Sequence, residues 1–110
     1  LQRCRQTSEA LHVQGELDRV YLDVGATQTI LGSPEIRVSG DNAPTAIVWN
    51  PGAAIAASLP DLGEGTHLQF ICLERGAAFD NSITLAPQAT LEASVVIETG
   101  NGQTSTDPGQ

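Results

Sequence analysis

The sequence predicts an all-β fold, an antiparallel β-sandwich, on three observations. Short stretches of alternating apolar and polar residues recur roughly every ten residues, and turns rich in Gly, Pro and Asp separate them. No apolar period of 3.6 residues lasts long enough for a helical bundle or a βαβ unit. The chain has 110 residues, of which 40% are hydrophobic. It is therefore one domain or part of one, and it is long enough to bury a core.

The first expected strand, Asp18–Val24, begins a predicted sandwich over residues 15–98, which follows a polar edge over residues 1–14. Its even positions are apolar except for the first, so Asp18 is expected on the inward-facing side at the start of the strand. The next three strands are each bounded by turn-forming residues. They are Thr27–Leu31 after Gly25, Glu35–Ser39 between Gly32-Ser33-Pro34 and Gly40-Asp41-Asn42, and Thr45–Asn50 before Pro51-Gly52.

The second half of the chain alternates less regularly. Ala53–Leu59 is rich in alanine and does not alternate, which predicts a short helix or turn. Two later strands are expected over Ser82–Ala86 and Thr90–Glu98. The last of them places Leu91, Ala93, Val95 and Ile97 on one face. Residues 99–110 are mostly Gly, Gln, Thr, Ser, Asp and Pro, and we expect a flexible tail there.

A strand that ends in an acid is expected over His67–Glu74. Alternation places Leu68, Phe70, Cys72 and Glu74 on the same side, and the first three favour a dry environment. A carboxylate at the mouth of an apolar cavity is a candidate general base or acid, because lost solvation moves its pKa toward neutrality. The strand by itself favours a simpler interpretation, in which Glu74 is solvated or paired with Arg75.

The charge of the chain excludes several classes of partner. Thirteen acidic residues face five arginines, there is no lysine, and the formal net charge is -8. Such a surface repels nucleic acid and anionic membranes. A phosphate-bearing ligand would need cations from Arg19, Arg37 or Arg75, or from outside the chain. Cys4 and Cys72 make no disulfide framework, and no apolar run resembles a secretory or membrane-spanning segment, so we expect a cytoplasmic protein.

Metal and cofactor motifs are absent from the sequence. His12 and His67 do not stand at ligand spacing to another His, Cys or acid. There is no phosphate loop, no Gly-x-Ser-x-Gly elbow and no basic-aromatic stripe. We therefore expect no metal and no cofactor. Trp49 is most simply a core or rim aromatic, and sugar stacking is the alternative.

Four short segments, in their order and spacing, resemble the C-terminal part of hexose-6-phosphate mutarotases. These are the glucose-6-phosphate 1-epimerases of the aldose 1-epimerase superfamily. The four segments are Val48-Trp49-Asn50-Pro51-Gly52, Leu59-Pro60-Asp61-Leu62-Gly63, Phe70-Ile71-Cys72-Leu73-Glu74 and Leu85-Ala86-Pro87. In addition, Glu16–Leu22 resembles the acid-Arg-x-Tyr strand of that family. The resemblance covers about residues 15–97.

The resemblance implies the C-terminal part of a galactose-mutarotase-like supersandwich, in which strands line an open sugar cleft. It also implies the family's reaction, which interconverts the α and β anomers of a hexose 6-phosphate in carbohydrate metabolism. In this family the glutamate that Glu74 matches is the general base for the anomeric hydroxyl, and a histidine is the general acid for the ring oxygen. Asp18 matches the family's acid near the sugar hydroxyls. Arg19, Trp49 and Asn50 complete the candidate substrate contacts.

The chain also departs from the family. The family's catalytic histidine and phosphate-binding arginines lie N-terminal to anything in this sequence, and Arg75 is unexpected after the base. We therefore expect a base without its acid, and whether the chain is an enzyme by itself stays open. The alternative is a non-catalytic β-sandwich that binds carbohydrate or protein through Trp49, Tyr21 and Asp18. Exposed sheet edges would favour a homodimer or a strand-swapped oligomer.

Overall fold

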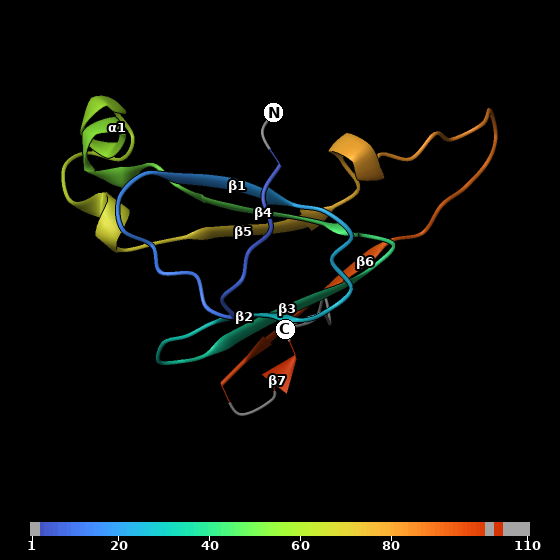
Figure 1. Ribbon diagram of the computed structural model, residues 1–110, viewed down its shortest axis with the longest axis horizontal. Helices are drawn as coiled ribbons and strands as arrows, with labels where there is room; N and C mark the ends of the chain where they lie inside the picture. Colours follow the sequence, from blue (N-terminus) through green and yellow to red (C-terminus); the bar gives the residue numbers. More distant parts are fainter. Residues whose placement is uncertain (1–2, 101–102, 105–110) are drawn as a thin grey trace. The chain divides into compact units, whose positions relative to one another are not determined.

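The computed structural model describes residues 3–100 and, as backbone, 103–104 (Figure 1). The chain divides into two compact units, and each is described by itself. The first unit comprises Leu1–Asp18 and Trp49–Ile71, and the second comprises Arg19–Val48 and Cys72–Gln110. Most of the tail expected to be flexible lies outside the described residues, so this expectation and the domain boundaries stay predictions.

The strands form two antiparallel sheets, as the sequence predicted for an all-β sandwich. One sheet has the order β1 (Leu17–Tyr21), β4 (Thr45–Asn50) and β5 (Cys72–Gly76). The other has the order β2 (Gln28–Ile30), β3 (Ile36–Asp41), β6 (Ser94–Thr99) and β7 (Gln103–Thr104). The remaining elements are the helix α1 (Gly52–Ser58) and the 3₁₀ turns η1 (Thr66–Leu68) and η2 (Phe79–Asn81).

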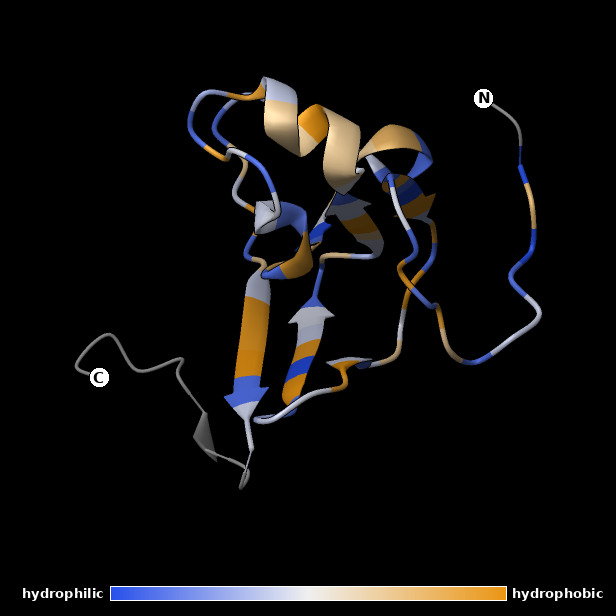
Figure 2. Cartoon of the chain, turned by 90° about the vertical axis from the view of Figure 1, so that its left-hand side faces the viewer, coloured by the Kyte–Doolittle hydropathy of each residue, from blue (hydrophilic) through white to orange (hydrophobic). Residues whose placement is uncertain are grey.

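The second unit contains the whole four-stranded sheet, and its register defines two faces. Val38 of β3 pairs with Ile97 of β6, and Arg37 pairs with Glu98. Since neighbouring residues point to opposite faces, one face is apolar and the other carries charge. Val38 is 5% exposed and lies in a core of small side chains. Figure 2 shows hydrophobic colour along most of β6, the strand that leads toward the grey C-terminal trace.

The first unit contains α1, which confirms the short helix expected near Ala53–Leu59. Ala56 of this helix is fully buried. Gly52 begins the helix with a φ of +73°, and a Cβ there would lie 2.7 Å from the backbone nitrogen of Glu16. Only glycine combines this left-handed backbone with so close an approach. The Pro-Gly pair therefore ends β4 and also lets the chain pass against the segment before β1.

The strand expected over His67–Glu74 is shorter than predicted. Its first part is the 3₁₀ turn η1, and β5 begins only at Cys72. The backbone carbonyls of His67 and Phe70 accept hydrogen bonds from the Asn50 side chain, at 2.9 and 2.8 Å, instead of joining a strand ladder. The prediction that Leu68 and Glu74 face a dry side is wrong, because Leu68 is 81% exposed and Glu74 is exposed too.

Several other strands differ from expectation. Asp18 was expected to face inward, but it is exposed and Val20 is 39% exposed; the half-buried residues of β1 are instead Leu17 and Tyr21. Ser82–Ala86 forms no strand, since it follows η2 as irregular chain. The strand expected over Thr90–Glu98 begins only at Ser94. Conversely, β3 continues to Asp41, because its last two residues pair with Val95 and Ser94.

Candidate functional site

Glu74 lies in the middle of β5 in the second unit, and its side chain is exposed. Within the described part of the chain its carboxylate has no hydrogen bond and no ion pair, so the expected alternative of a pair with Arg75 is wrong. Glu74 lines a cavity of about 260 Å³. The other lining residues are Thr45, Ile47, Arg75, Gly76, Ala77 and Ala78. The carboxylate is therefore solvated, and it lies beside a cavity that is lined mostly by small residues.

Hydrogen bonds hold the chain that follows Glu74. Thr45 is 1% exposed, and its hydroxyl donates to the carbonyl of Ala78 at 3.0 Å and accepts from the N–H of Ala78 at 3.2 Å. Three residues further on, Asn81 donates to the carboxylate of Asp23 at 2.8 Å and accepts from the Asp23 N–H at 3.0 Å. One wall of the cavity beside Glu74 is therefore fixed at its base.

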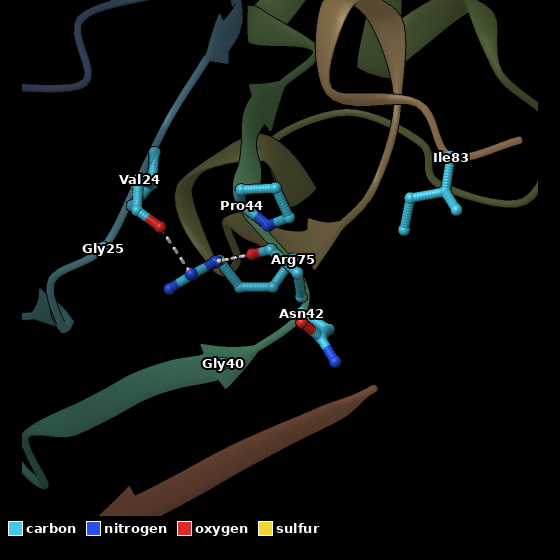
Figure 3. A pocket seen from close by; sticks show the side chains of 8 residues that line it. Val24, Gly25, Gly40, Asn42, Pro44, Arg75 and Ile83 are labelled. Carbon is cyan, nitrogen blue, oxygen red and sulfur yellow. Dashed lines mark hydrogen bonds between the residues drawn. The ribbon is translucent and has the colours of Figure 1, made fainter. Parts of the chain in front are cut away.

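Arg75 organises the other side of this region (Figure 3). Its Nε donates to the carbonyl of Ala43 at 3.0 Å, and its Nη2 donates to the carbonyl of Val24 at 3.0 Å. Its Nη1 donates to the carbonyl of Ala26 at 3.2 Å and to Oε1 of Gln28 at 2.8 Å. One guanidinium thus joins β5 to two segments that are far away in sequence, the stretch from Val24 to Gln28 and the loop at Ala43.

Arg75 also lines a second cavity, of about 440 Å³. Gly40 forms part of its wall, and a Cβ on Gly40 would lie 3.5 Å from Cζ of Arg75. The other lining residues are Val24, Gly25, Asn42, Ala43, Pro44 and Ile83. The walls are mostly apolar, and Figure 3 shows Arg75 extending past Pro44 toward the carbonyl of Val24.

The three arginines considered as phosphate ligands differ in what they already bind. Arg37 donates to Glu35 at 2.9 Å and to Glu98 at 3.4 Å, and the hydrogen bond that it donates to Glu35 is the main reason that the pKa of Arg37 lies above its ordinary value. Arg75 is bound to four oxygens. Of these three, only Arg19 has no hydrogen bond or ion pair among the described residues, and it is exposed on β1.

The remaining candidate substrate contacts are Asp18, Trp49 and Asn50, all in the first unit. Trp49 is half-buried and packs in a tilted arrangement on Phe70, with ring centroids 6.1 Å apart. Asn50 is 2% exposed, and its oxygen accepts from the Gly52 N–H at 2.9 Å while its amide holds two carbonyls. Asp18 is exposed. Their assignment as sugar contacts, with Arg19, stays a prediction.

Other chemical features of the described residues are few. Both cysteines are free, Cys4 exposed and Cys72 half-buried. No group of three His, Cys, Asp or Glu side chains in the described part of the chain is placed to hold a metal ion. None of the helices described there has the length and apolarity that a membrane span requires.

Comparison with known proteins gives one informative likeness. The chain is 29% identical over 89 residues to a protein of Cenchrus ciliaris described as "Putative glucose-6-phosphate 1-epimerase". The match covers 78% of this chain and 27% of that protein, so the chain spans about a quarter of its length. Because only about a fifth of the chain lies outside the match, the matched stretch includes Glu74 and Trp49 wherever it begins. No family model and no solved structure matches the chain.

Proposed function

We propose that the chain is the base-bearing part of an aldose 1-epimerase-like protein that interconverts the anomers of a hexose 6-phosphate, with Glu74 as the general base. The observation that carries the proposal is the likeness to the C. ciliaris protein across a stretch that includes Glu74. The exposure of Glu74 beside a cavity supports it, because a base must reach its substrate. The lack of an ion pair to Glu74 among the described residues supports it too.

The reaction needs two groups that exchange protons. Glu74 would take the proton of the hydroxyl on C1, and the electron pair left on that oxygen would form the carbonyl bond. The bond between C1 and the ring oxygen would break, and the ring oxygen would take a proton from a general acid. Rotation of the aldehyde and the reverse steps then give the other anomer.

The acid and the phosphate-binding cations would come from outside this chain. His67 lies in η1 of the first unit, where its backbone carbonyl binds Asn50, and His12 is exposed. Neither is in the histidine context of the family. Loss of one member of an acid–base pair typically lowers the rate by a factor of roughly 10² to 10⁴. We therefore expect the isolated chain to exchange glucose 6-phosphate anomers at close to the buffer rate.

A chimera tests the assignment of Glu74. The chain replaces the matched quarter of the C. ciliaris protein, and anomer exchange of glucose 6-phosphate is measured by NMR exchange spectroscopy. We expect exchange well above the buffer rate, and Glu74→Gln should lower it by a factor of about 10² to 10⁴. The matched control is Glu92→Gln, which removes another exposed carboxylate of the second unit and should leave the rate unchanged. A Glu74→Gln chimera as fast as its parent would contradict the proposal.

The isolated chain provides the complementary measurement. Exchange well above the buffer rate that disappears in Glu74→Gln would show that the chain holds its own acid, contrary to the expectation of an incomplete site. Trp49 is the single tryptophan, so its fluorescence also reports sugar binding. A fluorescence response to hexoses without exchange, in the chain and in the chimera, would favour the non-catalytic carbohydrate-binding alternative.

A further inference from the structure

We propose that Phe79 is a substrate-binding residue, whose ring contacts the C–H face of the hexose while Glu74 meets the anomeric hydroxyl. Phe79 begins η2 and directly follows Ala78, which lines the cavity beside Glu74. These residues all belong to the second unit. The identity of the ligand rests on the proposed function.

The backbone of Phe79 is unusual. Its φ is +55°, in the left-handed region, which a bulky side chain rarely adopts because its Cβ crowds the following carbonyl oxygen. Most other described residues with positive φ are glycine, aspartate or asparagine, which tolerate this conformation. Phe79 is the one large apolar residue among them. Glycine would be unstrained here, so the backbone does not explain why the residue is a phenylalanine.

Packing does not explain it either. Phe79 is 51% exposed, so its ring is not part of the core, and the other aromatic residues of the chain, Tyr21, Trp49 and Phe70, are all more buried. Trp49 and Phe70 contact each other, whereas Phe79 has no ring contact within the described part of the chain. Residues held in a strained conformation without a packing role are concentrated at ligand-binding positions.

Hydrogen bonds on both sides of Phe79 hold its backbone in place. Before it, Ala78 is bound through its N–H and its carbonyl to the Thr45 hydroxyl. After it, the side chain of Asn81 forms two hydrogen bonds with Asp23, and the Asn81 N–H donates to the carbonyl of Ala78 at 3.0 Å. The ring is therefore presented from a fixed turn, which reduces the ordering that a ligand must impose when it binds.

The surroundings of Phe79 fit a hexose, which has hydroxyl groups around its edge and C–H bonds on its faces. Glu74 supplies a free polar group at the cavity, and the small side chains of Ala77 and Ala78 leave room beside it. Ligand sites combine a few such polar groups with apolar and aromatic surface. Trp49 lies in the first unit, whereas Phe79 is the exposed aromatic residue of the unit that contains the base.

The test measures binding of glucose 6-phosphate by saturation-transfer NMR, in the full chain and in the chimera with the C. ciliaris protein. Phe79→Ala and Phe79→Gly both remove the ring and should each weaken binding by about tenfold or more. Phe79→Tyr keeps the ring and should bind within about twofold of the parent. Phe79→Gly should nevertheless have a urea midpoint about 0.5 M above that of Phe79→Ala, because only glycine relieves the strain.

Leu31→Ala is the matched control, since Leu31 is a 77% exposed apolar residue of the second unit that does not line the cavity beside Glu74. It should change binding by less than about twofold. In the chimera, Phe79→Ala should raise KM for anomer exchange by about tenfold and leave kcat within about twofold, because the ring contacts the ground state and the transition state alike.

Unchanged binding by Phe79→Ala overturns the inference, and so does an equal loss of binding in Leu31→Ala or Phe79→Tyr. Absence of saturation transfer in both proteins overturns it too. Binding that follows the urea midpoint across the variants would indicate a structural role and also overturns it. Anomer exchange that Glu74→Gln abolishes and Phe79→Ala leaves unchanged would contradict the inference and leave the proposed function standing. Ring-dependent binding without exchange by the chimera would do the reverse.

Discussion

Asn50 in the first unit and Arg75 in the second unit each connect segments that are far apart in sequence, but their surroundings differ. Asn50 is 2% exposed, and its neutral amide satisfies two carbonyls and one N–H. Arg75 is half-buried, and its charged fork satisfies four oxygens. Water can reach the partners of a half-buried group and replace it, whereas fully buried partners stay unpaired. The residue with fewer hydrogen bonds should therefore matter more for stability.

In the second unit, the side chains that hold the backbone in place can likewise be distinguished from the one that is free to act on a substrate. The polar groups of Arg75 and Thr45 form hydrogen bonds with backbone carbonyls around β5. Glu74, which lines the same cavity as these two residues, has no such bond among the described residues. A side chain that must meet a substrate has to be free itself, while the residues around it hold their positions. Glu74 and its two neighbours have this arrangement.

Removal of the Asn50 amide should have the largest effect on stability. Asn50→Ala leaves the carbonyls of His67 and Phe70 and the N–H of Gly52 without partners in a buried place. We expect the free energy of unfolding to fall by about 3 kcal/mol, measured by urea denaturation. Gln69→Ala, an exposed position in the same segment, is the control and should cost less than about 0.5 kcal/mol. A loss at Asn50 no larger than that of the control would contradict the comparison.

A pair of glycines sharpens the account of the first unit. Gly52 and Gly63 both have positive φ, +73° and +82°, but a Cβ on Gly52 would meet the Glu16 nitrogen at 2.7 Å, whereas a Cβ on Gly63 has nothing within 4 Å. Gly63→Ala should therefore cost only the backbone strain, about 1 kcal/mol. Gly52→Ala adds a collision with backbone and should cost about 2 to 3 kcal/mol in the same denaturation measurement. Equal losses would mean that the close approach to Glu16 relaxes freely.

Much of the fold could be predicted from the sequence, because it follows local pattern. Thr45–Asn50 was predicted with the bounds that β4 has, since Pro51 and Gly52 end any ladder. Prediction failed where a distant side chain decides the backbone. The amide of Asn50 holds His67 and Phe70 out of a strand, and alternation along the chain contains no sign of this.

The candidate site was predictable only in part. The motif that singled out Glu74 is local, and the position of Glu74 on a strand is confirmed. Its exposure agrees with the solvated interpretation that the strand by itself favoured. The apolar side that alternation assigned to it was wrong, because parity along a strand does not say which face the rest of the molecule covers. The role of Arg75 was missed as well. Its partners lie at Val24, Ala26, Gln28 and Ala43, and the one sequence signal was that an arginine is unexpected after the base.

The loss of the Arg75 fork should have a smaller effect than the loss of the Asn50 amide. Arg75→Met keeps most of the stem and removes all four hydrogen bonds, and we expect it to lower the free energy of unfolding by about 2 kcal/mol, since water replaces part of what is lost. Arg75→Lys keeps the charge but not the planar fork, so it should recover less than half of this loss. Arg37→Met is the matched control, because Arg37 donates to exposed carboxylates that water serves equally well, and its effect should be smaller than that of Arg75→Met. Full recovery by lysine would show that charge alone holds β5 to its loops, and an Arg75→Met loss larger than that of Asn50→Ala would reverse the order argued for the two units.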